Sequence, residues 1–233
     1  MKRFALVLIL FLLPGLLKAQ RDTLSSPVSC PMLGASAVLM ATGTSFHYVP
    51  ALREQTESFQ QTVADWRGDR PKCTVDNFLQ LSHPVAMVAL KACGVPSRHN
   101  WYDMVSTSVV GYATMLIVVN TGKYSFGMLR PDGSAHNSFP SGHTATAFTG
   151  AELMRIEYWE TSPWIGVAGY VVATATGFLR IYNNRHWCAD VMAGAGVGIL
   201  SAQFANWITP KINGWLAPKQ PTFSLNSPLK YEL

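Results

Sequence analysis

Long uncharged stretches define the second half of the sequence. Residues 104–122, 162–179 and 191–209 contain no Asp, Glu, Lys or Arg over 19, 18 and 19 positions, respectively. About twenty predominantly apolar residues cross a bilayer as a helix. The pattern therefore predicts three long helices and favours a membrane-embedded bundle. Because Ser, Thr and Gly dilute all three stretches, a soluble all-helical bundle with a strongly apolar core is the alternative.

Two further stretches are predicted to form helices of the same bundle. Residues 79–95 begin with a shorter uncharged run, and residues 144–158 contain three charged side chains. An ion inside a bilayer is costly unless it pairs with an opposite charge or lies near an interface. Glu152 and Arg155 are three positions apart, so on a helix they lie on one side and are able to pair.

The region before residue 79 has a different character. Residues 31–49 are uncharged but rich in Ala, Gly, Ser and Thr. Because a full span here would break the parity that places all three later motifs on the outer side of the membrane, we predict a periplasmic or interfacial segment. Residues 50–78 are the most polar part of the chain. Their apolar residues follow a helical spacing and predict an amphipathic helix that ends near Gly68.

The first twenty residues have the three regions of a secretory signal. Lys2 and Arg3 precede an apolar run over residues 4–17, and Ala19 offers a small residue for cleavage. We predict a signal peptide over residues 1–19, with an uncleaved anchor as the alternative. Its removal takes away three basic side chains and lowers the formal net charge from +5 to +2. The basic balance is largely a targeting feature, and no basic stripe indicates a nucleic-acid partner.

Three short motifs contain the residue types that phosphoryl transfer needs. They are K-x6-R-P at residues 123–131, P-S-G-H at residues 140–143 and R-x5-H-x3-D at residues 180–190. The reaction requires cations around the phosphate oxygens, a nucleophile in line with the leaving oxygen and an acid that protonates this oxygen. All of these groups occur in the three motifs.

The candidate residues follow from these requirements. Lys123, Arg130 and Arg180 can surround the phosphate oxygens as cations. His143 and His186 can supply the acid and the nucleophile. The sequence therefore predicts a phosphate site that needs neither a metal nor a cofactor.

Local spacing refines this prediction. His186 and Asp190 are four positions apart, so on a helix they would lie on one face, where the carboxylate can hold the imidazole Nδ1–H and leave Nε2 free to attack. Ser141 and the Gly142 amide precede the helix predicted from residue 144. A helix N-terminus offers N–H groups and a positive dipole end to a phosphate oxygen, and glycine lets the backbone approach the ligand.

In order, spacing and residue type, the motifs resemble those of the type 2 phosphatidic acid phosphatases, a superfamily that includes bacterial acid phosphatases and vanadium haloperoxidases. The resemblance covers roughly residues 122–196, and Leu179 departs from it where the family usually has Ser. It implies an all-α helical bundle and a phosphohistidine on His186, oriented by Asp190. It also implies that His143 protonates the leaving alkoxide and later activates water.

The resemblance implies a phosphorylated lipid as substrate, such as phosphatidic acid, phosphatidylglycerophosphate, undecaprenyl pyrophosphate or lipid A. We expect a lipid phosphatase in the bacterial inner membrane, with its site facing the periplasm and lipid A or another envelope lipid favoured. A soluble periplasmic acid phosphatase of broad specificity is the runner-up. A vanadium haloperoxidase and a silent phospholipid-binding membrane protein are further alternatives.

These observations divide the chain into four predicted regions. They are a signal peptide (1–19), an N-terminal periplasmic or interfacial segment (20–78), a phosphatase helical domain (79–217) and a C-terminal tail (218–233). The four cysteines lack the C-x-x-C spacing of a zinc site. Cys30 and Cys73 are candidates for a disulfide, because both are expected on the oxidising side. Cys93 is expected to be buried.

Overall fold

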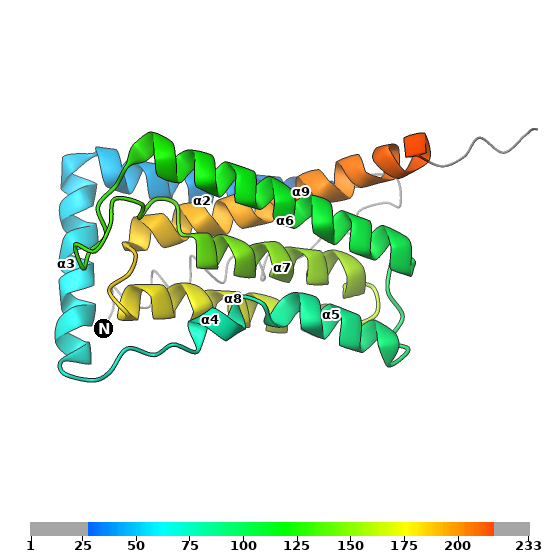
Figure 1. The fold of residues 1–233 in the computed structure, drawn as a ribbon, viewed down its shortest axis with the longest axis horizontal. Helices are drawn as coiled ribbons and strands as arrows, with labels where there is room; N and C mark the ends of the chain where they lie inside the picture. Colours follow the sequence, from blue (N-terminus) through cyan, green and yellow to red (C-terminus); the bar gives the residue numbers. More distant parts are fainter. Residues whose placement is uncertain (1–27, 217–233) are drawn as a thin grey trace, which may run out of the picture.

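The computed structural model describes residues 28–216, and this part of the chain is a bundle of helices (Figure 1). The helices are α2 (Cys30–Tyr48), α3 (Pro50–Arg67), α4 (Asp76–Leu79), α5 (Ser82–Ala92), α6 (Trp101–Phe126), α7 (Gly142–Tyr158), α8 (Pro163–Tyr182) and α9 (Cys188–Leu216). The described residues contain no strand, which confirms the predicted all-α fold. The predicted signal peptide and C-terminal tail lie outside the described residues.

Helix α9 forms the axis of the bundle, and α2, α6 and α7 pack along it. Glycines allow the backbones to approach closely. A Cβ atom at Gly198 of α9 would lie 2.5 Å from the carbonyl oxygen of Ala145 in α7, and one at Gly43 of α2 would lie 2.6 Å from the carbonyl oxygen of Ala189. Packing through small residues is characteristic of helices within membranes.

Helices α6, α8 and α9 are long and apolar enough to cross a membrane, as the uncharged stretches predicted. They differ in their surroundings. In α9, 89% of the apolar 18-residue stretch is buried, but in α6 only 28% of the corresponding stretch is. Val105, Val109 and Ile117 of α6 are exposed. A soluble protein rarely exposes a contiguous apolar face of this kind. Helix α6 therefore forms part of a lipid-facing surface.

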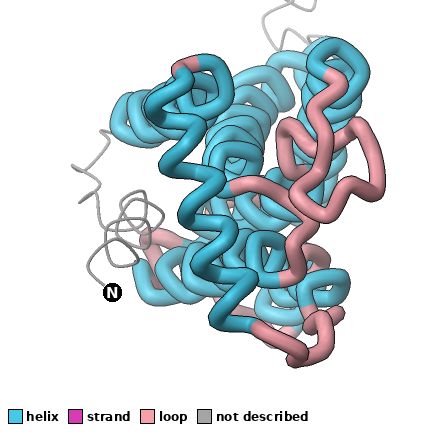
Figure 2. Tube along the Cα trace, turned by 90° about the vertical axis from the view of Figure 1, so that its left-hand side faces the viewer, coloured by secondary structure: helices cyan, strands magenta, loops and turns pink. Residues whose placement is uncertain are grey.

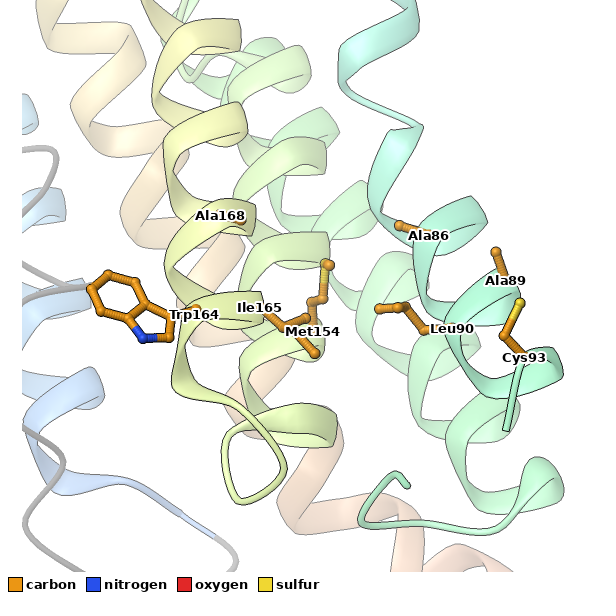
Figure 3. A pocket seen from close by; sticks show the side chains of 8 residues that line it. All are labelled: Ala86, Ala89, Leu90, Cys93, Met154, Trp164, Ile165 and Ala168. Carbon is orange, nitrogen blue, oxygen red and sulfur yellow. The ribbon is translucent and has the colours of Figure 1, made fainter. Parts of the chain in front are cut away.

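Apolar grooves on the outside of the bundle support the same conclusion. Between α5, α7 and α8 lies a groove of about 540 Å³, lined by side chains that include Leu90, Met154 and Ile165 (Figure 3). A second groove, of about 490 Å³, lies between α5 and α6. Exposed apolar surface of this extent marks contact with a membrane or a partner. Together with the three candidate spans, the grooves identify a membrane-embedded bundle.

The charged side chains of α7 are compensated inside the bundle. Arg155 donates two hydrogen bonds of 2.8 Å to Glu152, from Nε and Nη2, which confirms that these residues pair. Tyr170 of α8 donates to Glu152 at 2.6 Å, and Gln203 of α9 donates to the same carboxylate. The backbone N–H of Ser29 donates to Gln203 at 2.9 Å. One buried carboxylate thus connects α7 with α8 and α9 and, through Gln203, with the start of α2.

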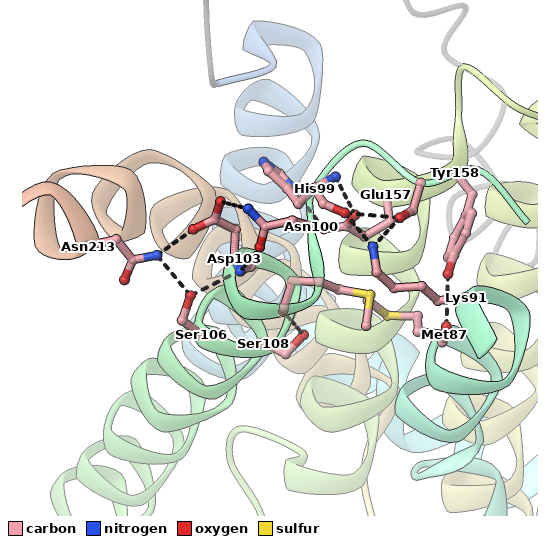
Figure 4. A network of polar contacts seen from close by, with 12 residues as sticks. Met87, Lys91, His99, Asn100, Asp103, Ser106, Ser108, Glu157, Tyr158 and Asn213 are labelled. Atoms are coloured by element: carbon pink, nitrogen blue, oxygen red, sulfur yellow. Dashed lines mark hydrogen bonds and ion pairs between the residues drawn. The ribbon is translucent and has the colours of Figure 1, made fainter. Parts of the chain in front are cut away.

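A second polar network lies at the C-terminal end of α7, away from Gly142 (Figure 4). His99, just before α6, lies 2.7 Å from Glu157 through its Nδ1. Lys91 of α5 donates to the carbonyl oxygen of His99. Asn213 of α9 donates to Asp103 of α6 at 2.7 Å. The loops and helix ends at this end of the bundle are therefore fixed by side chains far apart in the sequence.

The N-terminal region differs partly from the prediction. Residues 31–49 were expected to form a periplasmic or interfacial segment, but α2 packs lengthwise along α9 within the bundle. Helix α3 is the predicted amphipathic helix, and it ends where Gly68 adopts a φ of 54°. It crosses one end of the bundle almost at right angles to the long helices (Figures 1 and 2). The small residues of α2 are therefore an interface with α9 rather than a sign of a peripheral segment.

The cysteines also differ from the predictions. All four are free, so Cys30 and Cys73 do not form a disulfide. Cys30 begins α2, whereas the backbone N–H of Cys73 donates a hydrogen bond to the side chain of Asn183 just after α8. Cys93 is exposed because it ends α5, and Cys188 is buried in the core.

Candidate active site

The three motifs meet at the end of the bundle that α3 crosses. Helices α6 and α8 end there, while α7 and α9 begin there (Figure 1). The predicted site residues are Lys123 in the last turn of α6, Arg130 in the following loop, Ser141, Gly142 and His143 at the start of α7, Arg180 in the last turn of α8, His186 in the α8–α9 loop and Asp190 in the first turn of α9. The fold brings together residues that lie up to 67 positions apart.

Three cations concentrate positive charge at this end. Lys123, Arg130 and Arg180 are close enough for their charges to repel one another. Lys123 lies beside Gly142 and donates to the carbonyl oxygen of Asn137 at 2.6 Å. The Nε–H groups of Arg130 and Arg180 are buried and have no hydrogen-bond partner among the described residues. Such donors are costly unless an acceptor reaches them, and an anion satisfies both the charge and the donors.

Two residues of α4 contact this site, and the sequence did not predict either. Asp76 is buried and accepts a hydrogen bond of 2.6 Å from Arg180. Asn77 lies next to it, with its Oδ1 2.9 Å from His143 Nε2. The amide oxygen is an acceptor, so Nε2 of His143 carries the hydrogen in this contact. Both residues lie in a polar segment without a motif, and only the packing of α4 against α7 and α8 reveals them.

His186 and Asp190 lie together, but their local geometry differs from the prediction. Helix α9 begins at Cys188, so His186 belongs to the preceding loop rather than to a helical face. Its Nδ1 is 3.4 Å from Asp190 Oδ2. The same Oδ2 accepts a 2.8 Å hydrogen bond from the backbone N–H of Trp187 and another from Ser138 Oγ. Asp190 therefore holds the start of α9 as well as facing His186.

The burial of His186 affects its protonation. Only 1% of the residue is exposed. Loss of solvation lowers the pKa of His186 below its ordinary value of 6.5, while Asp190 acts in the opposite direction. The neutral imidazole is the form that can act as a nucleophile, so burial favours the reactive form at neutral pH.

The start of α7 is less open than the sequence suggested. The backbone N–H of Ser141 donates to the carbonyl oxygen of Asp190 at 3.0 Å, and its Oγ lies 2.9 Å from Thr144 Oγ1. A Cβ at Gly142 would meet Val119 at an ordinary contact distance of 3.6 Å. Ser141 thus connects the start of α7 to α9, and Gly142 packs beside α6. The N-terminus of α7 nonetheless lies beside Lys123, so its dipole adds to the positive charge of the site.

A third histidine, His47, also reaches Asp190. It lies near the end of α2, and its Nε2 is 2.7 Å from Asp190 Oδ1. The sequence gave no partner for this residue, because 143 positions separate it from Asp190. By contrast His136, in the loop between the first two motifs, is exposed and has its Nδ1 3.2 Å from the carbonyl oxygen of Gly127.

Comparisons with known proteins agree with this arrangement. Residues 117–213 match the profile of the PAP2 superfamily. The chain has the fold of a transmembrane PAP2-type phosphatidylglycerolphosphate phosphatase from Bacillus subtilis, with a TM-score of 0.55 at 15% identity over 81% of this chain and 99% of that one.

Two curated relatives are more similar in sequence. A lipid A 1-phosphatase from Porphyromonas gingivalis is 50% identical over 139 residues, which are 59% of this chain and 31% of the relative. An undecaprenyl-diphosphatase from Sulfolobus acidocaldarius is 29% identical over 100 residues, which are 38% of this chain and 47% of the relative. The chain thus spans less than half the length of either relative.

Proposed function

We propose that this chain is a phosphatase that hydrolyses a lipid phosphate monoester or pyrophosphate through a phosphohistidine and without a metal. The observation that supports this most strongly is the position of His186 and Asp190 beside three cations at one end of a membrane bundle. The cations supply the charge stabilisation that a metal provides in other phosphatases.

The proposed reaction proceeds in two displacements. Nε2 of His186 attacks phosphorus, the bond between phosphorus and the leaving oxygen breaks, and His143 gives its proton to that oxygen. His143 then takes a proton from water, the resulting hydroxide attacks the phosphohistidine, and inorganic phosphate leaves as His186 is restored. Asp190 orients His186 through Nδ1, and Lys123, Arg130 and Arg180 hold the phosphate oxygens with the N-terminal end of α7.

The lipid nature of the substrate is supported by the surface around the site. The bundle exposes apolar faces and grooves below the catalytic end. A substrate whose acyl chains lie in the same bilayer reaches the site without leaving the membrane. Among envelope lipids, lipid A is favoured by the 50% identity to a lipid A 1-phosphatase.

Phosphate release from a panel of lipids tests this proposal. Detergent-solubilised full-length protein is incubated with phosphatidic acid, phosphatidylglycerophosphate, undecaprenyl pyrophosphate, lipid A and a soluble aryl phosphate, all with a chelator present. We expect one lipid to exceed the aryl phosphate by at least about 100-fold in kcat/KM, the scale of specific recognition by a polar headgroup site. Orthovanadate should inhibit, because it mimics the transferred phosphate. Loss of activity with the chelator, or equal rates for the soluble ester, would contradict the proposal.

We further propose that the protein lies in the inner membrane of a bacterium with its site facing the periplasm. The signal-like N-terminus and the position of Lys91, Arg98 and Lys211 at the end away from the site support this orientation. At the catalytic end most basic residues belong to the phosphate site or pair with carboxylates, as in Arg180–Asp76, Arg185–Asp132 and Arg53–Glu57.

Cysteine labelling tests the orientation. Exposed Cys93 lies at the end away from the site, and Ser134, in the site loop, is exposed and can be replaced by Cys. In a background with Ser at positions 30 and 73, a membrane-impermeant maleimide should label Ser134→Cys in intact spheroplasts and Cys93 only after permeabilisation. The reverse pattern would place the site on the cytoplasmic side.

A further inference from the structure

His47 makes the shorter of the two histidine contacts to Asp190. Its Nε2 lies 2.7 Å from Oδ1, whereas Nδ1 of His186 lies 3.4 Å from Oδ2. The His47 side chain is 10% exposed and the Asp190 side chain is fully buried. Because carboxylate oxygens only accept hydrogen bonds, Nε2 of His47 must donate. One carboxylate therefore lies between two histidines, one from α2 and one from the loop before α9.

The fold holds His47 firmly in this position. Helix α2 packs against α9 through Gly43, which faces Ala189 and Ala193 one residue before and three residues after Asp190. The imidazole of His47 also packs edge-on against Phe139, with 4.9 Å between ring centroids. Phe139 follows Ser138, whose hydroxyl donates to Asp190 Oδ2. The contact is thus part of the packing between α2, the site loop and α9.

Each oxygen of Asp190 has its own set of donors. Oδ2 accepts from Ser138 and from the backbone of Trp187 and faces His186, while Oδ1 accepts from His47. A carboxylate fixed at one oxygen alone can still rotate about its Cβ–Cγ bond. Donation to Oδ1 removes that freedom and keeps Oδ2 directed at the nucleophile. Partners of this kind determine the orientation of a catalytic group although they never touch the substrate.

We propose that His47 is a positioning residue of this active site, which acts by fixing the Asp190 carboxylate that orients His186. The inference rests on the proposed function. It goes beyond the family resemblance, because α2 lies outside residues 117–213, which match the superfamily. The catalytic arrangement would then require a helix that the family motifs do not include.

Three substitutions test the role of His47 in the full-length protein. His47→Phe keeps a ring for packing against Phe139 but removes the donor, and His47→Gln restores an N–H at a similar distance along the side chain. His99→Phe is the matched control, because His99 makes a 2.7 Å contact with the Glu157 carboxylate at the opposite end of the bundle. Thermal unfolding in detergent is measured for all three, so that loss of folding is separated from loss of rate.

We expect His47→Phe to reduce kcat about 10- to 100-fold, the usual range for a residue that orients a catalytic group, with KM changed less than about 3-fold. His47→Gln should recover most of the rate, and His99→Phe should retain the wild-type kcat. In an Asp190→Asn background, His47→Phe should cause little further loss, because the carboxylate on which it acts is gone.

The ¹⁵N chemical shift of the His186 ring provides a readout that needs no substrate. In protein labelled with ¹⁵N-histidine, His47→Phe should move the His186 Nδ1 signal, and His99→Phe should not. An unchanged signal, or a kcat no lower than that of His99→Phe, would overturn the inference. If the wild-type protein released phosphate from none of the lipids, the proposed function would fail, while the ¹⁵N comparison would still decide whether His47 controls the environment of His186.

Discussion

Replacing His186 by alanine is expected to reduce kcat for phosphate release by at least about 10⁴-fold, because the covalent route loses its nucleophile. The cations around the phosphate remain in this variant, so binding should persist. KM is therefore expected to change little. Rapid acid-free quenching with ³²P-labelled substrate should reveal a base-stable phosphoenzyme in the wild-type protein and none in the variant.

Because His186 is buried, thermal unfolding of the variant in detergent is measured beside its rate, which separates loss of folding from loss of the nucleophile. His136→Ala, which changes an exposed histidine in the site loop, is the matched control and should keep the wild-type rate. Retention of near-normal turnover by His186→Ala would show that another group attacks phosphorus. A normal phosphoenzyme in that variant would lead to the same conclusion.

Replacing Arg180 by lysine is expected to reduce kcat/KM by about 10²- to 10³-fold, the cost of losing one directed donor to a developing charge. Arg180 is 7% exposed, donates one hydrogen bond to Asp76 and keeps a buried Nε–H without a partner among the described residues. Lysine retains the charge but cannot present two separate donors in one plane. The measurement is steady-state hydrolysis of the preferred lipid, together with inhibition by orthovanadate.

Arg185→Lys is the matched control for this prediction. Arg185 lies five positions further along, but its side chain is 38% exposed and pairs with Asp132 at 3.3 Å. Exposed ion pairs contribute little, so the rate should stay within about 3-fold of wild type. Equal losses in the two variants would indicate a general effect of positive charge at this end of the bundle rather than a specific phosphate contact.

The sequence predicted those parts of the fold that depend on local pattern. Uncharged length identified α6, α8 and α9, and helical spacing identified α3. It failed for α2, because residues 31–49 were assigned from membrane topology, and topology does not reveal a helix that packs backbone to backbone against a neighbour. Only the contact of Gly43 with α9 reveals this packing.

The candidate site shows the same difference between local patterns, which the sequence reveals, and long-range contacts, which it does not. Residues within short motifs were predicted because their types and spacing carry the chemistry. The helical reasoning for His186 and Asp190 was wrong in detail, since Asp190 accepts from the Trp187 N–H and α9 starts only at Cys188. His47, Asp76 and Asn77 were not predicted as site residues. Their contacts with the motifs span 66 to 143 positions, and no local pattern reports such a distance.

The arrangement around Glu152 has a consequence for how the chain enters the bilayer during synthesis. Its first partner, Arg155, belongs to the same helix, so the two opposite charges can neutralise each other before any neighbour arrives. The next partner, Tyr170, is in α8, which directly follows, and Gln203 in α9 comes last. The carboxylate thus acquires its partners in the order of translation. The Glu152 carboxylate is therefore not an uncompensated ion in hydrocarbon at the stage when α8 and α9 have yet to be synthesised.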